Sequence, residues 1–127
     1  MTDTFLLNDF YSIASVTKTD AAKLNAEVVL NADHAIFKGH FEQMPIVPGV
    51  CQTQLIKELL QEELNLNLTM VKGSNIKFMG MIIPQQHPKI SVELEYTQAD
   101  NLYTVEAKLF YDSTIFTKFK GDFAVIQ

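Results

Sequence analysis

The chain of 127 residues contains no arginine and no tryptophan, and its single cysteine is Cys51. Without arginine it has no bidentate guanidinium clamp for phosphate or carboxylate groups. A single cysteine excludes a disulfide within the chain. No apolar run approaches the roughly 18–20 residues of a membrane-spanning helix, and the acidic opening residues do not resemble a secretory signal. We therefore expect a soluble, cytoplasmic protein.

Charge and composition set two further limits. Ten lysines against fifteen acidic residues give a net charge of −5, so no basic field favours nucleic acid as the main partner. Apolar residues make up 47% of the chain and charged residues 20%, which is ordinary for a globular protein. At this length we expect one domain over residues 1–127 with a core that needs no disulfides.

Helical periodicity is clear in one segment, from Pro48 to about Leu66. Proline suits the first position of a helix, because its missing N–H has no partner there. The apolar residues fall on two adjacent lines at a spacing of four, which are formed by Cys51, Leu55, Leu59, Ile56, Leu60 and Leu64. A narrower polar strip comprises Gln54, Lys57, Glu58 and Gln61. This wide apolar face predicts a helix that is surrounded on most sides.

The rest of the chain alternates with a period of two, which is typical of strands. We expect strands over residues 11–17, 22–30, 70–83, 90–97, 102–111 and 114–126, with a long loop over residues 34–47. Gly73 and Gly80 are expected to bend the third of these strands. An antiparallel sheet and one broadly apolar helix bury each other best if the sheet curls around the helix. The predicted class is therefore α+β.

The loop before the helix carries the most specific motif. It reads Phe37-Lys38-Gly39-His40-Phe41, then Met44-Pro45-Ile46-Val47-Pro48-Gly49-Val50. A titratable imidazole next to a helix N-terminus is suited to proton abstraction beside a carbonyl group. The imidazole would take the proton, and the free N–H groups of the helix would hold the charge that develops on oxygen.

This motif and the order of the elements resemble the hotdog-fold thioester dehydratases, the (3R)-hydroxyacyl-acyl-carrier-protein dehydratases. The family loop reads Gly-His-Phe, then Pro-[Ile/Val], then Pro-Gly-Val at the start of its central helix. The segment from Gly73 to Phe78 with Ile83-Pro84, and the segment from Gly121 to Ile126, resemble later strands of the family. The resemblance covers nearly the whole chain. It implies a hotdog fold and a hydro-lyase that converts 3-hydroxyacyl thioesters into 2-enoyl thioesters in acyl-chain biosynthesis.

The resemblance also implies roles for individual residues. His40 matches the catalytic histidine that removes the proton next to the thioester carbonyl. Gly49 matches the glycine whose N–H polarises that carbonyl. The acid that holds and protonates the departing hydroxyl falls at Gln54. The neighbours that the resemblance places against the substrate are Phe41, Pro48 and Val50.

Gln54 departs from the family pattern, because the family has a glutamate or aspartate there. Glutamine can hold a hydroxyl by a hydrogen bond but cannot transfer a proton. Loss of a general acid typically costs about 10²–10⁴-fold in rate. Glu58, one helical turn later, and Glu42, two residues after His40, are alternative acids.

The resemblance implies a substrate carried on the phosphopantetheine of an acyl carrier protein or on CoA, with no further cofactor. It also implies a homodimer whose sheets join edge to edge, with the site at the interface, and leaves higher oligomers open. An acyl carrier protein is acidic, so a basic surface near the site would help it bind. The candidates are Lys72, Lys77, Lys118 and Lys120, which could equally be solvated lysines at a strand edge.

Two other functions remain open on the same fold. One is a thioesterase, although this chemistry also commonly uses a carboxylate to activate water. The other is a non-catalytic subunit that binds acyl thioesters and pairs with an active partner, for which Gln54 is the main support.

The other reactive residues have simpler interpretations. His34 and His87 lack a motif and are interpreted as structural or solvated. The histidines, the cysteine and the nearby carboxylates show no metal-ligand spacing, so no metal site is expected. Cys51 could be an activated nucleophile at the helix start. Its place on the apolar face favours a small buried side chain instead.

Overall fold

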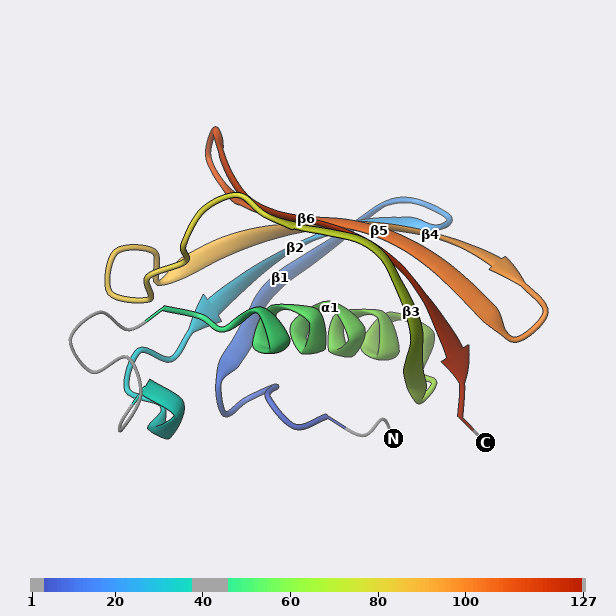
Figure 1. Ribbon diagram of the computed structural model, residues 1–127, viewed down its shortest axis with the longest axis horizontal. Coiled ribbons are helices and arrows are strands. Elements are labelled where there is room, and N and C mark those ends of the chain that lie inside the picture. The colour runs from blue at the N-terminus through green and yellow to red at the C-terminus, as the bar shows by residue number, and fades with distance from the viewer. Residues whose placement is uncertain (1–3, 38–45, 127) are drawn as a thin grey trace.

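In the computed structural model, which describes residues 4–37 and 46–126, one antiparallel sheet curls over one long helix (Figure 1). The helix α1 spans Gly49–Leu64. The strands are β1 (Tyr11–Asp20), β2 (Lys23–Leu30), β3 (Leu68–Phe78), β4 (Lys89–Ala99), β5 (Leu102–Tyr111) and β6 (Thr114–Val125), and a short 3-10 helix covers Ala35–Phe37. The predicted α+β arrangement is confirmed. No helix among these residues is long and apolar enough to cross a membrane.

The six strands lie in the order β1-β2-β4-β5-β6-β3, and every neighbouring pair is antiparallel. The strand that follows α1 therefore crosses to the far edge of the sheet, beside the last strand of the chain. This order leaves β1 and β3 as the two edges. Most residues of β3 are exposed, unlike those of the central strands.

The core lies between the sheet and α1. The strands β2, β4 and β5 alternate between buried and more exposed residues, because one face of the sheet packs on the helix. The helix contributes the buried apolar residues Cys51, Leu55, Ile56, Leu59 and Leu60. The wide apolar face predicted for this segment is thus confirmed.

Several predicted boundaries were wrong. The third strand was expected to reach residue 83, but β3 ends at Phe78. The expected bend at Gly80 is present, but it lies beyond the end of the strand. The backbone N–H groups of Met79 and Gly80 both bond to the carbonyl of Phe116, which turns the chain away from the sheet. The bend at Gly73 is real, since the register with β6 shifts between Gly73 and Asn75.

The segment before β1 passes along the side of α1 that faces away from the sheet (Figure 1). Phe10 and Tyr11 at its end are buried, whereas Phe5 is exposed. The helix is therefore covered on one side by the sheet and on the other by the first described residues. This explains why polar positions of α1 are buried as well as apolar ones.

Candidate functional site at the start of the central helix

The helix α1 begins one residue later than predicted. Pro48 has an extended backbone, with φ −62° and ψ 150°, and is the residue that caps the helix rather than its first member. Gly49 is the first helical residue. Among residues 4–37 and 46–126, nothing accepts the backbone N–H of Gly49 or Val50. Such free N–H groups carry the positive end of the helix dipole and suit a developing negative charge on oxygen.

The position of this helix start is fixed from both sides. The N–H of Val47 donates to the carbonyl of Ile82 at 2.9 Å. The buried amide of Gln52 donates through Nε2 to the carbonyl of Val47 at 3.2 Å, and its Oε1 accepts the hydroxyl of Thr117 on β6. Sequence reasoning missed this link, because 65 residues separate Gln52 from Thr117. In the sequence, the only indication of this link was that Gln52 is a polar residue on the apolar side of the first helical turn.

Phe78, at the end of β3, lies against Gly49. A Cβ atom at residue 49 would be 2.7 Å from Cζ of Phe78, which is closer than real carbon contacts. Glycine therefore allows the aromatic ring to approach the first N–H groups of the helix. The surroundings are apolar and open, since Val50 and Phe78 are 74% and 54% exposed.

Gln54 and Glu58 lie one turn apart on α1 and are directly bonded. Nε2 of Gln54 donates to Oε2 of Glu58 at 2.7 Å. The sequence placed both on a polar strip, but Glu58 is fully buried and Gln54 half-buried. Gln61 of the same strip is also buried, and its Oε1 accepts the N–H of Leu68. Glu58 and Gln61 of this strip thus bond other segments of the chain rather than facing water.

The Glu58 carboxylate holds the segment that precedes β1. It accepts the backbone N–H groups of Phe5, Leu6 and Leu7 at 2.8, 3.0 and 2.9 Å, and the hydroxyl of Tyr11 at 3.1 Å. Burial, followed by the nearby Glu58 charge, raises the pKa of the Tyr11 hydroxyl, so it stays protonated and donates. With Gln54, all five partners of Glu58 are donors.

These contacts affect whether Glu58 can serve as the alternative general acid. A general acid must hold a proton that it can give to the substrate, whereas the partners of Glu58 all suit an ionised carboxylate. The carboxylate is also fully enclosed. Its observed contacts are structural, and a role as acid stays a prediction.

Three predicted site residues, His40, Phe41 and Glu42, lie outside the described residues. Their roles therefore stay predictions. Of the residues that are described, Pro48, Gly49 and Val50 meet at the helix start, and Gln54 lies further along the same helix.

The remaining reactive residues have structural contacts. His34 bonds Asp9 through Nε2 at 2.8 Å and accepts the N–H of Ile36 through Nδ1 at 3.0 Å. His87 packs edge-on against Phe116, and no described residue bonds its buried Nδ1. Cys51 is buried, and burial raises the pKa of its thiol, which fits an inert packed side chain. Within the described ranges no group of three possible metal ligands occurs.

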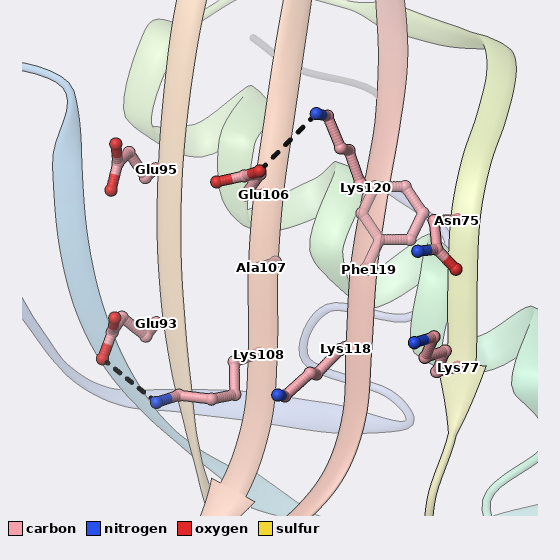
Figure 2. A pocket seen from close by; sticks show the side chains of 10 residues that line it. All are labelled: Asn75, Lys77, Glu93, Glu95, Glu106, Ala107, Lys108, Lys118, Phe119 and Lys120. Atoms are coloured by element: carbon pink, nitrogen blue, oxygen red, sulfur yellow. Dashed lines mark ion pairs between the residues drawn. The ribbon is translucent and has the colours of Figure 1, made fainter.

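A hollow of about 330 Å³ lies on the outer face of the sheet, with α1 behind it (Figure 2). Its charged rim is formed by Lys77, Lys108, Lys118, Lys120, Glu93, Glu95 and Glu106. Lys108 pairs with Glu93 at 3.8 Å and Lys120 with Glu106 at 3.7 Å. Lys118 lies directly between Lys77 and Lys108 in the register, so three lysines form a row over β3, β6 and β5. None of the residues that line this hollow belongs to the start of α1.

The sequence profile of the ApeI-like family, which is described as ApeI dehydratase, matches residues 16–114. The chain belongs to the ApeI-like dehydratase family. Membership of this family supports an enzyme of the dehydratase type, a hydro-lyase. The predicted resemblance to the thioester dehydratases is confirmed at the level of the family. No curated protein sequence matches the chain significantly.

Solved structures show the hotdog fold. The ApeI:P dehydratase heterocomplex from Xenorhabdus doucetiae matches with a TM-score of 0.70 and 17% identity, over 88% of this chain and 96% of that one. The BH2602 protein from Bacillus halodurans, solved with CoA, gives 0.59 and 12% over 89% and 74%. A putative thioesterase from Ralstonia eutropha gives 0.62 and 12% over 88% and 83%. At these identities the matches establish the fold alone.

Proposed function

We propose that this family member dehydrates 3-hydroxyacyl thioesters to 2-enoyl thioesters. The observation that carries the proposal is the pair of N–H groups at Gly49 and Val50, which no described residue accepts and which follow the histidine motif by eight or more residues. His40 takes the proton next to the thioester carbonyl. The N–H of Gly49 holds the negative charge that develops on the carbonyl oxygen.

The departing hydroxyl needs a proton that Gln54 cannot supply. The proton taken by His40 is available to return to the departing oxygen, so that water leaves and the imidazole is restored. Glu42 is the other candidate donor in the chain, because all the contacts of Glu58 come from hydrogen-bond donors. Gln54 holds the hydroxyl by a hydrogen bond.

The direct test is incubation of the protein with a panel of 3-hydroxyacyl thioesters, on CoA and on an acyl carrier protein, followed by mass spectrometry. A product that has lost water supports dehydration. Unchanged substrates across the panel, with the protein folded, would refute it.

A thioesterase is the second candidate, because a putative thioesterase shares this fold. The free N–H groups at Gly49 and Val50 would stabilise the oxyanion of hydrolysis equally well. Hydrolysis releases a free thiol and forms no enoyl product. Detection of thiol in the same incubation, without loss of water, would favour this candidate over dehydration.

The third candidate is a non-catalytic subunit that pairs with an active one. The structure from Xenorhabdus doucetiae is described as a dehydratase heterocomplex.

In this chain the edge strand β3 is largely exposed and includes the apolar residues Met70 and Val71, which would suit pairing with another sheet. We propose a homodimer through this edge. If the protein is monomeric by light scattering and shows no turnover on its own, the non-catalytic subunit is favoured over the homodimer.

We propose further that the row of Lys77, Lys118 and Lys108 attracts an acidic acyl carrier protein. Like charges directly opposite each other on neighbouring strands are unfavourable, and of the three lysines only Lys108 pairs with an acidic side chain among the described residues. An anionic partner would relieve this repulsion. Lys118 is the central member of the row.

Replacement of Lys118 by glutamate is expected to lower kcat/KM for a carrier-linked substrate by about tenfold and to leave kcat/KM for the pantetheine thioester unchanged. The reason is that a surface charge changes mainly the encounter with the charged partner. Steady-state kinetics with both substrates at low salt would measure this. Lys89→Glu is the control for charge alone, because Lys89 lies outside the row. Equal losses for both substrates would contradict a docking role.

Replacement of Gly49 by alanine is expected to lower turnover by about 10–10²-fold, because small displacements at a reacting centre are costly. The new Cβ would meet Phe78 at 2.7 Å. Because that ring is half exposed, it can move, and the melting temperature should change little. The double variant Gly49→Ala/Phe78→Ala should recover part of the activity. Unchanged turnover in Gly49→Ala would show that the substrate does not approach this backbone closely.

A further inference from the structure

The orientation of the Gln54 side chain is determined by its neighbour. A carboxylate accepts hydrogen bonds, whereas an amide has one donating end and one accepting end. Since Oε2 of Glu58 lies 2.7 Å from Gln54, the NH₂ end must face Glu58. The carbonyl end, Oε1, then points away from Glu58. No described residue donates to that oxygen.

Glu58 itself cannot turn to suit a different orientation. Oε1 of Glu58 accepts Leu7 N–H and Tyr11 Oη, while Oε2 accepts the N–H groups of Phe5 and Leu6 together with Nε2 of Gln54. Backbone N–H groups are fixed donors. The carboxylate is therefore held on several sides, and reversal of the Gln54 amide would place two acceptors against each other.

We propose that Glu58 is a positioning residue that makes Gln54 present an acceptor, Oε1, to the acyl thioester. This inference rests on the assignment of Gln54 to the site. A hydroxyl on carbon 3 of the acyl chain can donate to that oxygen. A ketone at the same carbon can only accept a hydrogen bond. Its oxygen would therefore face Oε1, which is also an acceptor. The site therefore selects 3-hydroxyacyl over 3-oxoacyl thioesters.

The measurement is the ratio of the dissociation constants of acetoacetyl-CoA and 3-hydroxybutyryl-CoA, by isothermal titration at neutral pH. The wild type is expected to bind the hydroxy compound about tenfold more tightly, because the ketone leaves Oε1 of Gln54 without a hydrogen-bond donor. In Glu58→Met the acceptor for Gln54 is lost, the amide is free to reverse, and the ratio should fall to about one.

Glu58→Gln is the matched control. Its single oxygen can occupy the position of Oε2, where it serves Phe5, Leu6 and Gln54. The bond from Leu7 is lost, and the Tyr11 hydroxyl can turn to accept from the new NH₂ group. This variant should be less stable than the wild type and still keep the tenfold ratio. A merely structural role of Glu58 would predict the same ratio in all folded variants.

Glu58→Met removes the acceptor of three backbone N–H groups, and it could fail to fold. Gln54→Asn then replaces it, because the shorter side chain keeps the amide but cannot reach Glu58, whose other four bonds remain. The ratio should again fall to about one. An unchanged ratio in Glu58→Met or in Gln54→Asn, or equal binding by the wild type, would overturn the inference.

The outcomes separate this inference from the proposed reaction. A tenfold ratio that depends on Glu58, without any enoyl product, would retain the positioning role and refute dehydration. Formation of the enoyl product, with a ratio that does not depend on Glu58, would support dehydration and refute the positioning role. Failure of the wild type to bind either CoA ester would overturn both.

Discussion

Replacement of His40 by alanine is expected to lower dehydration of a 3-hydroxyacyl thioester by about 10²–10⁴-fold, because the variant lacks the base that removes the proton next to the carbonyl. Binding of the substrate should change much less, since the N–H groups at Gly49 and Val50, which no described residue accepts, remain. Initial rates and a separate binding titration would measure the two effects. A variant that keeps full turnover would show that the base lies elsewhere.

His34 offers a matched control in the same part of the chain. Its ring bonds Asp9 and the backbone of Ile36, and it packs edge-on against Phe10. Its replacement by alanine should lower the melting temperature and leave turnover of the folded protein close to that of the wild type. A large loss in both variants would point to damaged packing around the loop rather than to a missing base.

The sequence predicted the parts of the fold that depend on periodicity. The spacing of Cys51, Leu55 and Leu59 identified the helix, because a buried face repeats with the helical turn. The alternation in β4 and β5 identified those strands for the same reason. The end of β3 could not be predicted, because it depends on a carbonyl of Phe116 that accepts the chain at Met79.

The position of the helix start was predictable because a local motif encodes it. Pro48-Gly49 ends the loop and begins the helix, and the exposed N–H groups follow from helix geometry alone. The surroundings of Gln54 were not predictable. Glu58 was placed on a polar strip because its side chain is charged, yet it bonds residues more than fifty positions earlier in the chain. Periodicity carries no information about such pairings.

A buried carboxylate next to Gln54 changes what the departure from the family pattern means. Glutamine there gives Glu58 a fifth donor, whereas a glutamate would give it a second negative charge. Two carboxylates at this distance cannot both ionise freely, and the pair retains a proton to a higher pH. Gln54 therefore has no proton to give, and its amide adds one more hydrogen-bond donor to the Glu58 carboxylate.

Replacement of Gln54 by glutamate is accordingly expected to raise dehydration at neutral pH by up to about 10²–10⁴-fold. The Glu58 charge should raise the pKa of the new carboxyl, so that it stays protonated and can serve as the acid. Because the protonated form is the active one, the rate should fall as pH rises through that raised pKa. The free energy of unfolding should also fall as pH rises, since the unfolded chain loses this proton at a lower pH.

The double variant Gln54→Glu/Glu58→Gln tests the cause of this gain. Without the second charge, the pKa of the new carboxyl should return toward its usual range. The falling limb of the pH–rate profile should then move to lower pH, and the gain at neutral pH should shrink. Profiles of kcat for the wild type and both variants would measure this. No gain in the single variant, with the melting curve of a folded protein, would place the acid elsewhere and remove Gln54 from the reaction.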